Sequence, residues 1–322
     1  MKRKLLYLLA FMIAAGVIGA AMISIINKNP DKKAGKEASS INVVTSFYPT
    51  YIIGLNLLDQ VPGVHLDSLT DFEAGCLHDY QLTTGDMKLL SEADAFVMNG
   101  GGMESYIEDV VKNYPNLAMI NISEDIAMLD SMEEEGELNS HVWLDPKRYI
   151  LQIENFKDGL SEYLNSRSDL SEEQKRDIAQ KVSDNAEAYI NKVNQLESEL
   201  ETVKKELDVN QASENRNVII FHEAFAYLAD RLGLTVAHTI EIEADTALSA
   251  GEIADIIKLV RLEGINLLFT EEQYGASITD RIVEETGAEA YVIDSAVTGD
   301  GMKDSYLRSM EGNLKTLKAI FE

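Results

Sequence analysis

The sequence predicts an α/β fold of two lobes, each a small parallel sheet with flanking helices, joined by one long backbone helix. Two observations support this prediction. Short apolar runs rich in β-branched residues alternate with helical stretches in two separate series, which is typical of parallel sheets covered on both faces. One long amphipathic stretch lies between the two series. The 322 residues are also enough to give each lobe a core of its own.

The first series predicts an N-terminal lobe, which we assign to residues 41–165. Its strands are predicted at 41–47, 63–69, 95–99 and 117–123, and its helices at 49–58, 84–93 and 105–114. Three glycines follow Asn99 at the end of the third strand and predict a flexible turn. They lack the GxGxxG spacing, so the sequence does not predict a dinucleotide site here.

The second series predicts a C-terminal lobe, which we assign to residues 211–322. Its strands are predicted at 217–221, 234–242, 266–270 and 290–294, and its helices at 223–232, 249–262, 277–286 and 305–321. Ser249 and Glu252 have the spacing of a capping box, which predicts where the helix over 249–262 begins.

The segment between the lobes, residues 166–210, predicts one long helix over 171–208. Its apolar residues follow one another in steps of three or four: Ile178, Val182, Ala186, Tyr189, Val193, Leu196, Leu200, Val203 and Leu207. Such a stripe fits either a coiled-coil dimer or a helix that lies along both lobes as a rigid spine. Because α/β lobes flank this helix on both sides, we expect the spine, and a monomeric protein.

The N-terminus predicts export. Residues 1–26 combine three basic residues with an uncharged apolar run, which indicates either a signal peptide or a membrane anchor. Residues 27–40 are polar and predict a linker. Basic residues ahead of the apolar run send the remainder of the chain outward, so either alternative places the lobes outside the membrane. We expect the segment to tether the protein to the cell surface.

Composition excludes several classes of function. Lys and Arg number 28 against 55 Asp and Glu, a net charge of −27, so the surface repels phosphate backbones and nucleic-acid binding is excluded. Cys76 is the single cysteine, which excludes an intramolecular disulfide and a Cys-rich zinc module. Since Cys76 has no CxxC partner, we expect a small packed residue; a soft metal ligand is the alternative.

Four residues could bind a metal: three lie at or beyond the ends of predicted strands, and the fourth, His141, directly follows an acidic loop. They are His78, His141, His222 and Asp294. Ligands in parallel α/β sheets bind beyond the carboxyl ends of the strands, and three imidazoles with one carboxylate make a closed tetrahedral site for a divalent metal. Simpler roles stay open: each histidine could be merely exposed, Asp294 could cap a turn, and Asp145 could cap a helix that starts near Pro146. His65 and His238 lie inside predicted strands and are expected to be structural.

Motifs around these residues resemble those of a known family. They are SFYPTYIIG at 46–54, the series His78, Tyr80, Thr83 and Asp86, the series His141, Trp143, Asp145 and Pro146, the stretch 221–234, and the stretch 292–317. From residue 42 to 321 the chain resembles the solute-binding proteins of zinc and manganese ABC transporters, the TroA-like cluster A-I family. Two departures are Leu77, where proline is common, and an acidic loop at 130–140 without the histidines of many zinc members.

The resemblance implies a TroA-like fold and a non-enzymatic function. Such proteins capture a divalent metal outside the membrane and deliver it to an ABC permease. It implies His78, His141, His222 and Asp294 as the ligands. Nitrogen-rich sites suit Zn²⁺, so zinc is expected as the transported ion, with Mn²⁺ as the alternative. Two other classes stay open: a zinc-dependent hydrolase with Glu223 as general base, and a membrane-tethered adhesion protein.

Overall fold

The computed structural model describes residues 40–77, 80–133, 135–210, 216–240, 248–271 and 276–321. The chain divides into two compact units, residues 1–40 and residues 41–322, and every described helix and strand lies in the second unit. The predicted signal peptide or anchor at 1–26 lies outside the described residues, as does the linker up to residue 39. Within the described ranges, no helix is both long and apolar enough to cross a membrane.

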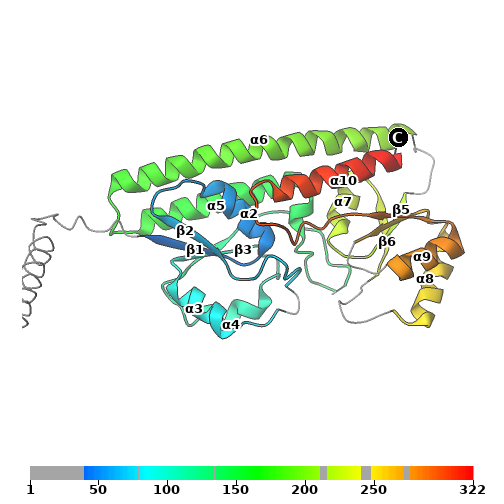
Figure 1. Cartoon of the computed structure of the whole chain (residues 1–322), viewed down its shortest axis with the longest axis horizontal. Helices are drawn as coiled ribbons and strands as arrows, with labels where there is room; N and C mark the ends of the chain where they lie inside the picture. The colour runs from blue at the N-terminus through cyan, green and yellow to red at the C-terminus, as the bar shows by residue number, and fades with distance from the viewer. Residues whose placement is uncertain are drawn as a thin grey trace, which may run out of the picture. The chain divides into compact units, whose positions relative to one another are not determined.

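The first sheet is a four-stranded parallel sheet in the order β2-β1-β3-β4 (Figure 1). Its strands are β1 (Ile41–Thr45), β2 (Val64–Ser68), β3 (Ala95–Met98) and β4 (Ala118–Asn121). Alternate residues of each strand point to opposite faces. Val43 and Val97 therefore pack into the main core with α2 (Tyr48–Leu57) and α5 (Pro146–Ser166). On the other face, Val44 and Phe96 pack into a separate cluster with α3 (Thr84–Glu92).

The helix predicted over 105–114 is shorter in the structure. A 3₁₀ turn, η1 (Ser105–Ile107), leads into the single-turn α4 (Glu108–Val111). Pro115 follows closely, and the residue before a proline is pushed out of the helical region. This explains why the helix ends early.

The second sheet repeats the topology of the first, in the order β6-β5-β7-β8 with all strands parallel. Its strands are β5 (Asn217–Ile220), β6 (Thr235–Thr239), β7 (Leu267–Thr270) and β8 (Glu289–Val292). Its helices are α7 (Phe225–Leu232), α8 (Ala250–Glu263), α9 (Ala276–Thr286) and α10 (Ser305–Phe321). Val218 and Ile220 face the main core, whereas Ile219 and Leu268 face a cluster formed with α8 and α9. The predicted capping box is present, because the Ser249 and Glu252 side chains each accept a hydrogen bond from the other residue's backbone N–H.

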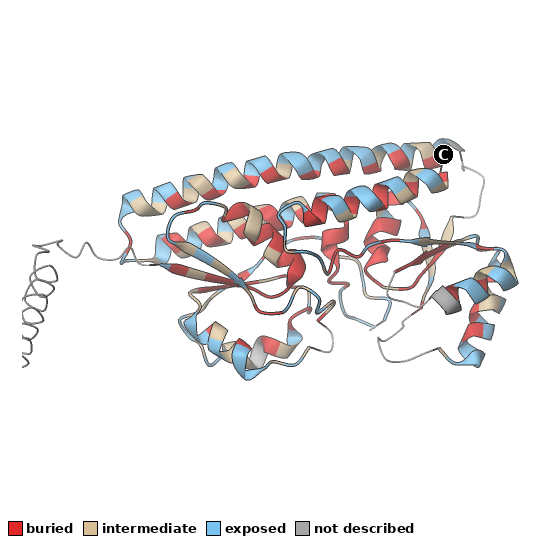
Figure 2. Ribbon diagram, in the orientation of Figure 1, coloured by how far each residue is buried: buried red, intermediate tan, exposed pale blue. Residues whose placement is uncertain are grey.

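The long helix α6 (Glu172–Asn210) packs along one face against helices of both lobes: α2 and α5 of the first lobe, and α7 and α10 of the second (Figure 1). Every residue of its predicted apolar stripe is buried, from Ile178 at 8% exposed to Leu207 at 0% (Figure 2). Because helices of the same chain already cover this stripe, it is not available to pack against α6 of a second copy. The packing therefore favours the spine over the coiled-coil dimer. The predicted fold class is confirmed.

Candidate metal centre

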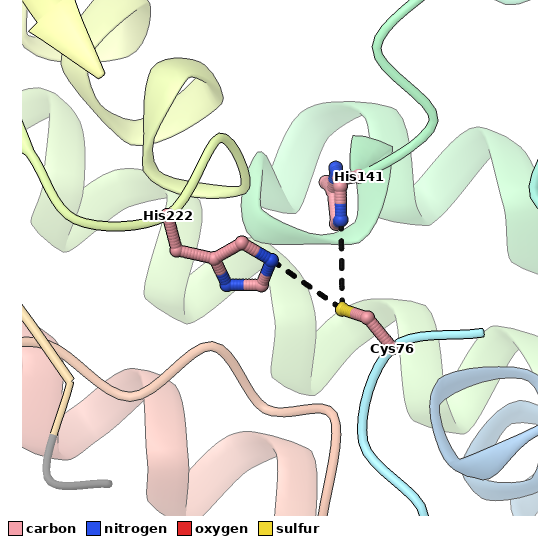
Figure 3. Close-up of side chains that lie close together, drawn as sticks. All are labelled: Cys76, His141 and His222. Carbon is pink, nitrogen blue, oxygen red and sulfur yellow. Dashed lines mark hydrogen bonds between the residues drawn. The ribbon is translucent and has the colours of Figure 1, made fainter. Parts of the chain in front are cut away.

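Three side chains meet where loops of the two lobes come together. Among the described residues, Cys76, His141 and His222 form a group whose ligand atoms all lie within 4.8 Å of one another. The Cys76 Sγ lies 3.5 Å from Nε2 of His141 and 3.5 Å from Nε2 of His222 (Figure 3). Cys76 comes from the loop after β2 and His222 directly follows the end of β5, so each lobe contributes. Thiol and imidazole groups at these separations can bind a divalent metal ion.

His141 is held by Asn139 in one orientation and one tautomer. The ring is buried, and its Nδ1 lies 3.0 Å from the Asn139 Oδ1. The Asn139 amide nitrogen donates to the Glu223 carbonyl oxygen at 3.1 Å, which assigns Oδ1 as the acceptor facing His141. Nδ1 of His141 therefore carries the proton, and Nε2 is the nitrogen left to bind a metal.

His222 has a similar partner. Its Nδ1 lies 3.4 Å from Oε1 of Glu271, a buried carboxylate at the end of β7. Burial lowers the pKa of His222, but the Cys76 sulfur and the Glu271 carboxylate outweigh it and hold that pKa well above its usual value. Surroundings that favour a proton on the ring also favour a metal cation in its place.

The segment after His141 anchors the site to the fold. The 3₁₀ helix η2 (Val142–Leu144) holds Trp143, whose indole is fully buried and whose Nε1 donates to the Ser295 carbonyl at 2.8 Å. Asp145 then caps α5 by accepting from the Lys147 N–H, and pairs with Arg148 at 2.7 Å. The capping alternative for Asp145 is therefore confirmed.

A glycine-rich turn also supports His141. The three glycines at 100–102 all have positive φ, a conformation that suits glycine. The turn predicted to be flexible is held instead by the fully buried Glu104, which accepts from the N–H of Asn99 at 2.7 Å and of Gly100 at 3.0 Å. Asn99 in turn donates to the Ser140 carbonyl at 2.8 Å, next to His141. A buried carboxylate therefore helps to position His141 through the backbone.

The burial of Glu104 predicts a pH-dependent stability. Burial raises its pKa from 4.5 to about 7, against the hydrogen bonds from Ser46, Gly100 and Asn99. The folded protein then retains a proton that the unfolded chain releases near pH 4.5, so stability falls as the pH rises through this window and levels off above it. Each pKa unit corresponds to about 1.4 kcal/mol, so we expect a loss of about 3 kcal/mol.

Urea unfolding of the wild type and of Glu104→Gln across this pH range tests the expectation. The variant cannot ionise at this position, so other carboxyl groups cancel in the comparison. We expect the difference in unfolding free energy between the two proteins to change by about 3 kcal/mol from about pH 5 to about pH 8. A difference that is flat with pH would show that Glu104 does not titrate in this range.

The predicted ligands differ in where the structure places them. His141 and His222 are brought together, as described above. His78 lies outside the described residues, two positions beyond Cys76. Asp294 is exposed, and its Oδ1 accepts from the Ala296 N–H at 2.8 Å, the geometry of a turn cap. It is not a member of the group formed by Cys76 and the two histidines.

The sequence favours Cys76 as a packed residue over a soft metal ligand. Its half-buried side chain does touch the main core. Its sulfur nevertheless faces both histidine rings (Figure 3). The sequence offered one indication of this proximity: its single cysteine stands two residues before the predicted ligand His78.

The remaining histidines and Glu223 lie in other surroundings. His65 and His238 lie exposed in β2 and β6, which are edge strands. Glu223 is buried, and its Oε1 accepts from the Met132 N–H of the acidic loop at 130–140. This hydrogen bond ties the acidic loop to the start of α7.

Comparisons with known proteins agree with this architecture. A family model described as ZnuA, "Zinc-uptake complex component A periplasmic", matches residues 43–320. The zinc-binding protein AdcA of Streptococcus pyogenes is 27% identical over 305 residues, which cover 86% of this chain and 55% of that protein. The high-affinity zinc uptake system protein ZnuA of Bacillus subtilis is 25% identical over 313 residues, 91% of each chain.

A solved structure shows the same fold. The crystal structure of Zn(II)-bound AdcA from Streptococcus pneumoniae has a TM-score of 0.71 at 24% identity, and the match covers 88% of this chain and 58% of that one. This chain spans about half the length of AdcA, with 55% of the S. pyogenes protein covered. Because the family model matches most of the sequence, the chain belongs to the ZnuA family of periplasmic zinc-uptake components.

Proposed function

We propose that this protein captures a divalent metal ion, zinc, outside the membrane and delivers it to an ABC permease. The observation that carries the proposal is the meeting of His141 and His222 from different lobes. Each ring has its Nε2 at 3.5 Å from the Cys76 Sγ and its Nδ1 directed at an oxygen of another residue. Two preoriented imidazoles cost little reorganisation when a metal binds. Membership of a zinc-uptake family supports the same function.

The proposed ligand set begins with the two described histidines. The resemblance adds His78 and Asp294 as predicted ligands. Nitrogen donors suit Zn²⁺ better than Mn²⁺, which prefers carboxylate and carbonyl oxygens. Zinc is therefore the proposed cargo, as the names of the relatives also indicate for those proteins.

The proposed mechanism is binding and release of the metal, with small movements between the lobes. Hydrogen bonds near the site link residues far apart in sequence: Trp143 to Ser295 at 2.8 Å, and the Tyr48 hydroxyl to Ser305 at 2.6 Å. Together with the α6 spine, these contacts oppose a wide opening of the cleft. We propose that the permease recognises the metal-loaded arrangement of the loops.

We further propose that the protein acts as a monomer, tethered to the membrane by its N-terminal segment. The monomer is supported by the complete burial of the α6 stripe within one chain. The tether is supported by the uncharged apolar run that ends at residue 26.

Metal retention tests the proposed function directly. The full chain, kept in mild detergent, is stripped with a chelator, offered equal concentrations of Zn²⁺ and Mn²⁺, dialysed and assayed by elemental analysis. We expect one zinc per chain, because the two imidazoles present borderline-soft nitrogen donors. One manganese in place of zinc would overturn the choice of metal, and no retained metal would overturn the function.

A further inference from the structure

We infer that the Cys76 thiolate is a ligand of the captured metal, and that it makes the site selective for zinc over manganese. This inference rests on the proposed function and adds a sulfur ligand to a predicted set of imidazole and carboxylate ligands. A tetrahedral zinc with Zn–S of about 2.3 Å and Zn–N of about 2.0–2.1 Å separates its sulfur and nitrogen ligands by about 3.6 Å. The Cys76 Sγ lies 3.5 Å from each of the two Nε2 atoms.

The directions of the three side chains agree with these distances. Both histidines have Nδ1 directed at an oxygen, Asn139 Oδ1 at 3.0 Å and Glu271 Oε1 at 3.4 Å, so Nε2 of each ring faces the sulfur. One sulfur and two imidazole nitrogens thus lie within 4.8 Å of one another, with the sulfur close to both rings (Figure 3). A packed cysteine would need neither ring nitrogen as a neighbour.

Cys76 and Asp294 are the two candidates for an anionic ligand beside the described histidines. Cys76 already adjoins the two described histidines, whereas Asp294 is exposed and its Oδ1 accepts from the Ala296 N–H at 2.8 Å. Metal binding would release the thiol proton to solvent, and the resulting thiolate would supply the negative charge otherwise expected from the carboxylate.

The chemical consequence is a softer site. Thiolate sulfur favours Zn²⁺ and other soft or borderline metals, while Mn²⁺ prefers oxygen. Cys76→Ser replaces the sulfur by oxygen. It should lower zinc affinity by more than the roughly 10–100-fold that is typical when a residue hydrogen-bonded to a metal ligand is mutated. Manganese affinity should change less, so the preference for zinc should narrow.

Cobalt provides a spectroscopic test of sulfur ligation. Co²⁺ bound to thiolate gives an intense charge-transfer absorption in the near ultraviolet that imidazole and carboxylate ligands do not give. We expect the full-length wild type to show this band at one Co²⁺ per chain and Cys76→Ser to lose it. His238→Ala is the matched control, because this exposed histidine of β6 lies outside the cluster and its loss should keep the band.

The outcomes separate the two proposals. Cobalt bound by the wild type without the band would overturn thiolate ligation and leave metal capture standing. No bound cobalt would overturn both. A second measurement needs no variant: Zn²⁺ should suppress alkylation of Cys76 by iodoacetamide in the wild type, since a metal-bound thiolate is a poor nucleophile. Alkylation at the same rate with and without zinc would also overturn the inference.

Discussion

Replacing His141 with alanine should lower zinc affinity by at least about 100-fold, because the change removes a proposed ligand outright. Loss of a residue that only hydrogen-bonds to a ligand costs about 10–100-fold. The His141 ring is buried and its Nε2 lies 3.5 Å from the Cys76 Sγ, so no neighbouring group can replace it without rearrangement. Zinc affinity is measured by competition with a fluorescent chelator.

A second histidine supplies the control for this experiment. His238 lies exposed in β6, away from the cluster, so His238→Ala should bind zinc like the wild type. Circular dichroism of both variants checks that each remains folded. Unchanged affinity in His141→Ala would remove His141 from the site.

Trp143→Ala is expected to be the most damaging change to stability. The indole is fully buried, packs edge-on against Phe47 with ring centroids 5.3 Å apart, and donates from Nε1 to the Ser295 carbonyl. Truncating a buried tryptophan leaves a large cavity, so we expect a loss of about 3–5 kcal/mol in the free energy of unfolding. Because Trp143 is the single tryptophan, urea unfolding is followed by circular dichroism.

Trp143→Phe distinguishes packing from hydrogen bonding at this position. Phenylalanine retains an aromatic ring against Phe47 but has no N–H for Ser295. The buried carbonyl then lacks its donor, which costs about 1–3 kcal/mol. We expect an intermediate stability. Equal losses in the phenylalanine and alanine variants would contradict the packing argument.

Much of the fold was predictable because it depends on local pattern. The β-branched runs at 41–45 and 217–220 form strands where they were expected, and Ser249 begins a helix with its predicted capping box. Periodicity also located the long helix to within two residues at its C-terminal end. Such features are encoded within a few neighbouring residues, so the sequence alone reveals them.

The candidate site was predictable only in part. The sequence predicts that His141 and His222 belong to one metal site formed by both lobes, and the structure brings them together. The sequence favours Cys76 as a packed residue and leaves a metal ligand only as the alternative, whereas the structure places its sulfur 3.5 Å from both Nε2 atoms. Which residues of a loop turn inward depends on the loop's path, and no short-range pattern in the sequence encodes that path.

The sequence by itself determined the two-lobed α/β architecture, the long apolar stripe and the small number of nitrogen and sulfur ligands, five histidines and one cysteine, in a strongly acidic chain. Only the tertiary structure decided what covers the stripe of α6, what holds the glycine turn at 100–102, and which donors share one point in space. The physical reason is common to all three. Amphipathic periodicity and residue type specify what a surface or side chain can contact, whereas its actual partner depends on how distant segments pack.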